Sequence, residues 1–289
     1  MRVSAQNYHS VNRFGDKVTV DMFKAAGFEC IDYTFHDLAK EHPFYDDNAY
    51  REYFTDLRRY ADSVGMAFNQ AHAQFSYIKF DDDAYNARLH SLIERAIEVC
   101  GILGIKICVV HPLMGVGLSL EEEYEISMKQ YRSLLPLCKK YGVKVGVENM
   151  WKYDNIEDHC LPGPCGLSTD YLRYLDDLDP EYFVACLDLG HGEMGYTGDD
   201  CVTHIRALGN RLQALHVHDN DLVHDDHTIP YLGKMDWDTI VGALKEIGYN
   251  GDFTFESDNF VAKFPKELTA SALRLMSDVG HYIVNRYGL

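Results

Sequence analysis

Acidic and imidazole side chains recur at one place in a repeating pattern, the end of a short apolar run. These residues are His72, His111, Glu148, Asp188, His218 and Glu256. Carboxylates and imidazoles bind divalent metals, and they also remove and return protons. Several carboxylates brought close together would repel one another unless a cation held them. The residue types therefore predict a divalent-metal site with mostly oxygen ligands, provided that the fold brings these run ends together.

Further candidate ligands stand near these run ends. His191 follows Asp188 by three positions, and Asp225 and His227 lie two positions apart in the segment DLVHDDHTIPYLGKMDW. We expect this segment to be a loop over the site, where its residues bind additional metal or contact a substrate. Aromatic residues are candidates for the wall of a pocket, and each of them has an equally good place in the core. They are Tyr8, Phe75, Trp151, Tyr196 and Trp237.

The segment HVHDND contains two histidines, His216 and His218. Side chains alternate along a strand, so both histidines point to the same side. We expect His218, the one nearer the strand end, to be the metal ligand. His216 is then expected to lie deeper, as packing or as support for a ligand.

The elements that must position these residues alternate along the whole chain. Short β-rich runs are separated by amphipathic helical patterns such as residues 85–104 and 121–142, the second of which ends in Gly142. The expected strands are residues 2–6, 28–34, 67–72, 105–111, 144–149, 182–188, 212–218 and 252–257. About eight strand–helix units predict one (β/α)8 TIM barrel over residues 1–289, and its strand ends converge on one face. A doubly wound open sheet is the alternative, but no glycine-rich phosphate loop follows the first strand.

Composition limits the partners and the compartment. The formal net charge of −18 argues against a nucleic-acid-binding surface, which needs clustered Lys and Arg. The segment MRVSAQNYHS lacks the order of a secretory signal, and no apolar run is long enough to cross a membrane. We therefore expect a cytoplasmic protein with reduced thiols and no membrane partner. No second pair at zinc spacing accompanies Cys160 and Cys165, so we expect neither a disulfide nor a metal there.

The motifs resemble those of a known family. They are VEN around Glu148, CLDLGH around Asp188, HVHDND around His218, DDHTIPYLGKMDW, and FTFES around Glu256. In this order they resemble the xylose-isomerase-like TIM-barrel superfamily, and the resemblance spans nearly the whole chain. That superfamily includes sugar-phosphate isomerase/epimerase-like proteins, ketose 3-epimerases and endonuclease IV.

The resemblance to ketose epimerases implies a function in carbohydrate metabolism. Glu148, Asp188, His218 and Glu256 would bind one divalent ion: Mn, Co, Mg or Zn. Glu148 and Glu256 would be the catalytic pair that transfers a proton through an enediolate of a small sugar or polyol-derived carbonyl compound. The epimerase pattern also has an arginine in the loop after the metal-binding histidine, and the DNDLVHDDH that follows His218 contains none.

The resemblance to endonuclease IV implies an alternative, a phosphodiesterase that cleaves DNA at abasic sites with up to three zinc ions. In that case His72, His111, His191, Asp225 and His227 would be further metal ligands; in an isomerase they would bind the substrate. The motif sequences differ, because that family has motifs closer to LDTCH and HLNDS at the positions where this chain has LDLGH and HVHDND. A barrel that binds metal and ligand without turnover is the third interpretation. Association into a homo-oligomer stays open, as many relatives form dimers or tetramers.

Overall fold

The computed structural model describes residues 1–154, 159–194 and 199–288 and contains the predicted (β/α)8 TIM barrel. Eight parallel strands form one sheet in the order β10-β1-β2-β3-β4-β5-β8-β9. They are β1 Val3–Gln6, β2 Cys30–Thr34, β3 Ala67–His72, β4 Ile107–Val109, β5 Lys144–Glu148, β8 Phe183–Asp188, β9 Leu212–His216 and β10 Phe253–Phe255. A parallel bridge between Val217 and Phe255 connects the last two strands and nearly closes the barrel.

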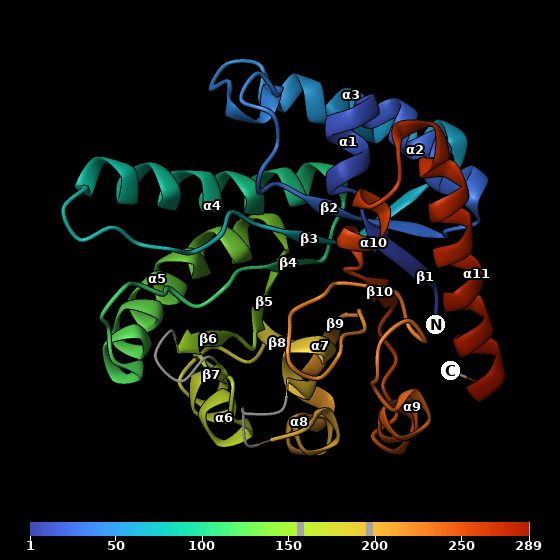
Figure 1. Ribbon diagram of the computed structural model, residues 1–289. Helices are drawn as coiled ribbons and strands as arrows, with labels where there is room; N and C mark the ends of the chain where they lie inside the picture. Colours follow the sequence, from blue (N-terminus) through green and yellow to red (C-terminus); the bar gives the residue numbers. More distant parts are fainter. Residues whose placement is uncertain (155–158, 195–198, 289) are drawn as a thin grey trace.

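Helices surround the barrel, and the last of them packs against the first strand and the second helix (Figure 1). They are α1 Tyr8–Phe14, α2 Asp16–Ala26, α3 Tyr50–Val64, α4 Asp83–Leu103, α5 Leu120–Tyr141, α6 Ser168–Asp176, α7 Leu189–Glu193, α8 Cys201–Leu208, α9 Trp237–Glu246, α10 Asp258–Ala262 and α11 Thr269–Tyr287. Helix α5 ends as predicted at Gly142, and α4 ends in the same way at Gly104; their φ angles of 64° and 77° lie in the left-handed region. None of the described helices is both long and apolar enough to cross a membrane.

The barrel interior is layered from an uncharged floor to a charged mouth. Near the amino ends of the strands, Ser4 Oγ donates to Thr254 Oγ1 at 2.8 Å, and Asn69 Nδ2 donates to both hydroxyls at 3.0 Å. One layer higher, Gln70 Nε2 donates to Asp32 Oδ2 at 3.0 Å. Hydrogen bonds between uncharged side chains therefore connect the floor, and the clustered carboxylates lie at the carboxyl ends of the strands.

The structure differs from the predicted elements at several strand ends and in one hairpin. Strands β4, β9 and β10 end at Val109, His216 and Phe255, two residues earlier than predicted, so His111, His218 and Glu256 stand in the loops beyond them. An antiparallel hairpin of β6 (Trp151–Asp154) and β7 (His159–Pro162) follows β5 and was not predicted. Its two short strands pair only with each other, so they lack the buried run that marks a barrel strand. All eight cysteines are buried and unpaired.

Candidate metal centre

The predicted residues converge at the carboxyl ends of the strands, where four adjoining groups of side chains present potential metal ligands. The central group consists of Glu148, Asp188, His216 and Glu256. His216 Nδ1 lies 2.9 Å from Glu256 Oε2 and 3.1 Å from Glu148 Oε1. Three of these residues are the last of their strands, and the β8–β9 ladder pairs Asp188 directly with His216. Strand register therefore positions the central group.

Two further groups share one glutamate each with the central group and extend toward β3. The imidazole group consists of His72, His111 and Glu148, with 2.7 Å between the two Nε2 atoms and 3.0 Å from His111 Nε2 to Glu148 Oε2. The other group joins His72 and Glu256 to His36, a residue that we did not predict. Both ring nitrogens of His36 are buried without a hydrogen-bond partner. A histidine shortly after a predicted strand was the available signal, but His36 does not end the apolar run.

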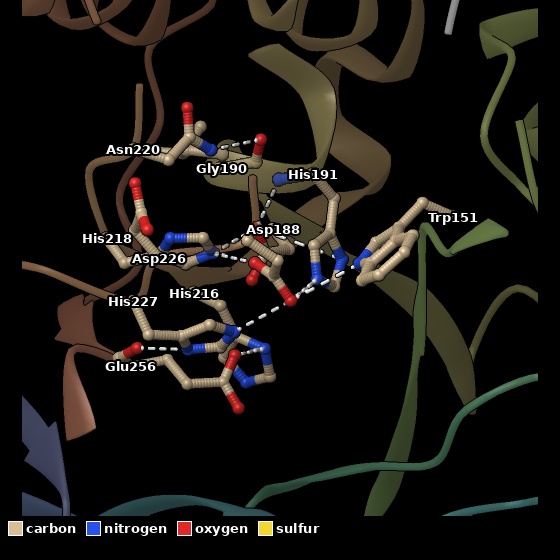
Figure 2. Close-up of polar contacts among 12 residues, drawn as sticks. Trp151, Asp188, Gly190, His191, His216, His218, Asn220, Asp226, His227 and Glu256 are labelled. Carbon is tan, nitrogen blue, oxygen red and sulfur yellow. Dashed lines mark hydrogen bonds and ion pairs between the residues drawn. The ribbon is translucent and has the colours of Figure 1, made fainter. Parts of the chain in front are cut away.

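The fourth, the loop group, consists of His191, His218, Asp225 and His227. Asp225 lies at its middle, because its Oδ2 is 3.1 Å from His227 Nε2 and 3.5 Å from His191 Nε2. The His218 and His227 rings stack with centroids 4.1 Å apart. Figure 2 shows His191 between Asp188 and Trp151, and His227 above Glu256. The loop therefore does reach over the mouth, as its sequence suggested.

The arrangement of the two histidines of HVHDND differs from the prediction. Both are fully buried, but it is His216 that lies with Glu148, Asp188 and Glu256. His218 Nε2 instead lies 2.9 Å from Asp188 Oδ1, on the side of the loop group. The predicted set of Glu148, Asp188, His218 and Glu256 is thus split, and Asp188 connects its two parts.

The donor set fits a divalent cation. Two oxygens and a nitrogen of the central group are buried without any hydrogen-bond partner: Glu148 Oε2, Asp188 Oδ2 and His216 Nδ1. His216 Nδ1 nevertheless lies within 3.1 Å of two carboxylates, so these atoms converge on a shared space rather than pointing at one another. Ligand bonds of 2.0–2.2 Å in a tetrahedral site place neighbouring ligand atoms about 3.3 Å apart. The spacing and the missing hydrogen bonds are both those of a metal-binding group.

The electrostatics of the central group point the same way. Burial raises the pKa of Glu148, but His216 and His111 beside it outweigh burial and hold that pKa well below its ordinary value. Burial also raises the pKa of Glu256, and His216 again brings it well below. Burial lowers the pKa of His216, whereas Cys186, Glu148 and Glu256 raise it well above the ordinary value. Both glutamates are therefore ionised, and the described residues beside them balance that charge with an imidazolium, chiefly His216.

One member of the imidazole group, His72, is uncharged by contrast. Burial lowers the pKa of His72 to about 3, so its ring is neutral near pH 7. A neutral imidazole keeps the lone pair that a metal or a substrate hydroxyl needs.

Hydrogen bonds of Asp219 and Asn220, which directly follow His218, hold the loop group in place. Asp219 accepts from the backbone N–H groups of Tyr231 and Met235, at 2.9 and 3.2 Å, and from Trp237 Nε1 at 2.9 Å. Asn220 Nδ2 donates to Gly190 O at 2.9 Å. Asp219 and Asn220 thereby tie the segment DNDLVHDDHTIPYLGKMDW to α7 and to its own far end.

Two backbone features place the histidines of the loop group. A Cβ on Gly190 would lie 1.8 Å from His218 Cε1, so this position must be glycine for the ring to occupy its site. His227 has a φ of 45°, in the left-handed region, and its Nδ1 lies 2.7 Å from Glu256 O. A non-glycine residue in that region stores strain, which is often found at functional sites.

Asn149 and Trp151 connect the central group to the loop group. Asn149 Nδ2 donates to Asp188 O at 3.0 Å, and its Oδ1 accepts from Asp188 N at 2.7 Å. His191 Nδ1 lies 2.8 Å from Asn149 O, which turns Nε2 toward Asp225. Trp151 Nε1 donates to Asp225 Oδ2 at 3.2 Å. Neither role could be read from the sequence, because each depends on a partner in another element.

A cavity of about 270 Å³ opens above the metal-binding groups. Its lining consists of His72, Phe75, Tyr77, His111, Met114, Glu148, Met150, Trp151, His191, Asp225, His227 and Glu256. Of the aromatic candidates, Phe75 and Trp151 line it, whereas Trp237 is buried on Asp219 and Tyr8 lies against His9 and His36. Tyr196 lies outside the described residues. The cavity is therefore a substrate-sized space with ionised carboxylates at its base and apolar walls.

Comparisons with known proteins agree with this architecture. Relatives in Sinorhizobium fredii and Methanocaldococcus jannaschii, both uncharacterized proteins, are 29% identical over 194 residues and 27% over 218 residues. These alignments cover 64% and 72% of this chain, and 59% and 70% of the relatives, so the first spans less than two thirds of its relative.

Solved structures resemble the whole chain in fold. The IolI protein, solved with a zinc atom, has a TM-score of 0.74 at 17% identity, with 99% of both chains covered. An L-ribulose 3-epimerase has a TM-score of 0.73 at 16% identity, covering 99% of this chain and 94% of that one. The 3-keto-D-glucoside 4-epimerase of E. coli has a TM-score of 0.71 at 17% identity, with 99% of both chains covered. The family model of the xylose isomerase-like TIM barrel matches residues 20–279, and the chain belongs to that family.

Proposed function

We propose that this protein is a divalent-metal-dependent isomerase or epimerase of a small sugar or polyol-derived carbonyl compound. The observation that carries the proposal is the pair of ionised glutamates, Glu148 and Glu256, which flank His216 and both line the cavity. The named activities of two proteins that share the fold, an L-ribulose 3-epimerase and a 3-keto-D-glucoside 4-epimerase, support the same class of reaction.

The central group would hold the metal. Glu148, Asp188 and Glu256 supply oxygen ligands, and His216 supplies the nitrogen, with His218 as the alternative that the sequence favoured. The bound ion would polarise a substrate carbonyl group and so acidify the neighbouring C–H bond. A site of mostly oxygen ligands suits Mn, Mg or Co, and zinc also accepts this set.

The two glutamates would carry the proton. One ionised carboxylate removes the proton from the carbon beside the carbonyl, which gives an enediolate, and a glutamate then returns a proton to the other face or the other carbon. Gln6 Nε2 donates to Glu256 Oε1 at 2.9 Å and fixes that carboxylate, while Glu148 Oε2 has no such donor. His72 and His111 would orient substrate hydroxyls, and the walls formed by Phe75 and Trp151 would limit the entry of water.

Deuterium exchange tests this proposal directly. Protein loaded with Mn²⁺, Co²⁺, Mg²⁺ or Zn²⁺ would be incubated in deuterated water with D-fructose, D-tagatose, L-ribulose, 3-keto-D-glucose and an inosose, and exchange would be followed by NMR. We expect at least one of these to gain deuterium beside its carbonyl group. Elemental analysis of the same protein should give about one divalent ion per chain. Exchange with none of these compounds under any metal would contradict the proposal.

A second function is favoured by one observation, the four adjoining ligand groups, which provide room for more than one ion. Several zinc ions could activate a water for hydrolysis of a phosphodiester. However, among the described residues that line the cavity there is no lysine or arginine to bind a DNA backbone. Cleavage of an abasic-site duplex by protein holding two or three zinc ions would place this function first.

A further inference from the structure

A second cavity adjoins the one above the metal-binding groups. It has a volume of about 510 Å³ and shares Tyr77, Met114 and Trp151 with the first. We call it the outer groove, and its lining is Tyr77, Met114, Gly115, Val116, Gly117, Leu118, Glu123, Trp151, Lys152 and Tyr153. These residues come from the β3–α4 connection, the β4–α5 connection with the first turn of α5, and strand β6, whose elements lie on the same side of the barrel (Figure 1). The function proposed above uses none of the groove beyond the three shared residues.

Hydrogen bonds among these segments form the groove in advance of any ligand. Ile78 N donates to Met114 O at 2.9 Å, and Met114 N donates to Ser76 O at 3.0 Å, which joins the β3–α4 and β4–α5 connections. Glu123 then ties the second connection to the hairpin. Its Oε1 accepts from Gly115 N at 3.2 Å, and its Oε2 lies 2.6 Å from Lys152 Nζ. A groove fixed in this way orders little on binding, which favours affinity.

The chemistry of the lining identifies the kind of ligand. Tyr77 and Tyr153 are 45% and 46% exposed, so part of each side chain is accessible to a ligand in the groove. Flat aromatic faces pack well against the C–H face of a sugar ring, while Lys152 and the backbone groups around Gly115 are close enough to bind hydroxyls. Glu123 is fully buried and neutralises Lys152, so the groove offers no net positive charge to a phosphate or a nucleic acid.

We propose that the outer groove is a subsite for a second sugar ring, so that the substrate is a glycoside and not a free monosaccharide. The reacting ring would lie at the central group, and the glycosidic bond would pass between Tyr77 and Trp151 to a ring on Tyr153. This inference rests on the proposed function for the reacting ring, and it adds the class of substrate.

Binding of unreactive sugars tests the subsite without relying on turnover. Metal-loaded protein would be titrated with two one-ring sugars, methyl α- and β-D-glucoside, and with their two-ring counterparts, the methyl glycosides of maltose and cellobiose. A further probe, p-nitrophenyl β-glucoside, carries an aromatic group in place of the second ring. We expect at least one two-ring sugar to bind about tenfold more tightly than its one-ring counterpart. Tyr153→Ala should remove most of that advantage and leave the one-ring affinity unchanged. Tyr77→Ala should also remove most of the advantage, but Tyr77 lines both cavities, so this variant is judged by the ratio of the two-ring to the one-ring affinity alone. Tyr282→Ala is the matched control, since Tyr282 is 51% exposed on α11, away from the groove.

The outcomes separate this inference from the proposed function. Equal affinity for one and two rings, or an advantage that survives both tyrosine variants, overturns the subsite even if the ketose panel shows deuterium exchange. Tightest binding of p-nitrophenyl β-glucoside overturns the second sugar ring in favour of an aromatic substituent. A two-ring advantage that is lost in both variants supports the subsite, and failure of exchange with the whole ketose panel then counts against the proposed reaction alone.

Discussion

The central group and the loop group lie at the same mouth of the barrel, but different forces hold them. Glu148, Asp188 and His216 are terminal residues of hydrogen-bonded strands, so the ladder fixes their spacing. Asp225 and His227 belong to a long loop whose position depends on side-chain contacts. A group fixed by strands is already arranged before a metal binds, whereas a group fixed by a loop loses its geometry when one anchor is removed. We therefore expect proton transfer and metal binding to depend mainly on the central group. The loop group should have smaller effects on metal affinity and on stability.

The largest effect is expected when the central group loses a proton acceptor. Glu256→Gln keeps the size of the side chain, and its amide oxygen can still accept the hydrogen bond from Gln6. The amide cannot, however, remove a proton. Deuterium exchange on the best substrate should fall by about 10³-fold, while circular dichroism and the thermal midpoint remain near those of the unchanged protein. Glu267→Gln, on the exposed surface, should have no effect on exchange. Full exchange in Glu256→Gln would remove this glutamate from the mechanism.

Metal affinity distinguishes the two histidines of HVHDND. His216→Ala takes a nitrogen out of the central group, and we expect the dissociation constant of the metal to rise about 100-fold or more. His218→Ala removes a side chain that supports Asp188 from the loop side, and we expect a rise of about tenfold. Titration of the metal-free variants with a fluorescent competitor measures both. The reverse order would make His218 the ligand, as the sequence predicted, and would move the metal toward the loop group.

The sequence predicted the parts of this comparison that depend on strand ends. Glu148 and Asp188 end apolar runs, and parallel strands bring such ends together whatever the loops do, so barrel and mouth could both be predicted. Which histidine joins them could not, because alternation puts His216 and His218 on one side of the strand. That choice depends on where β9 ends and on a register shift against β8 between Ala185 and Cys186.

The loop group and the hairpin depend on contacts that no local pattern records. Asp219 positions the loop by accepting from Trp237, 18 residues away, and Trp151 reaches Asp225 across 74 residues. The sequence placed Asp225 and His227 over the mouth, but it could not assign Asp219, Asn220 or Gly190 a role. Each of these residues acts through partners that are distant in the sequence, so its type alone indicates an ordinary turn.

Gly190 offers a way to disturb the loop group and leave the central ladder intact. In Gly190→Ala the new methyl group would overlap the His218 ring, and we expect a loss of about 1–3 kcal/mol of unfolding free energy in urea. Gly242→Ala is the matched control, since a Cβ there meets no atom within 4 Å and the residue lies inside α9. That control should gain about 0.5–1 kcal/mol. Equal effects of the two substitutions would show that His218 moves aside at no cost.

The smallest effect concerns the charge of the loop group when metal has been removed by a chelator. Burial lowers the pKa of His191, but Asp188 and Asp225 outweigh it and raise that pKa to about 10. A pKa above the unfolded value of about 6.5 means that protonated His191 contributes its full stability below pH 6.5 and loses it as the pH rises toward 10. The unfolding free energy of the metal-free protein should therefore fall more steeply with pH than that of His191→Gln, by at most about 1.4 kcal/mol per pH unit for one proton. Parallel curves for the two proteins between pH 7 and pH 10 would mean that His191 is neutral in the folded chain, and that Asp225 obtains its balancing charge from His227 alone.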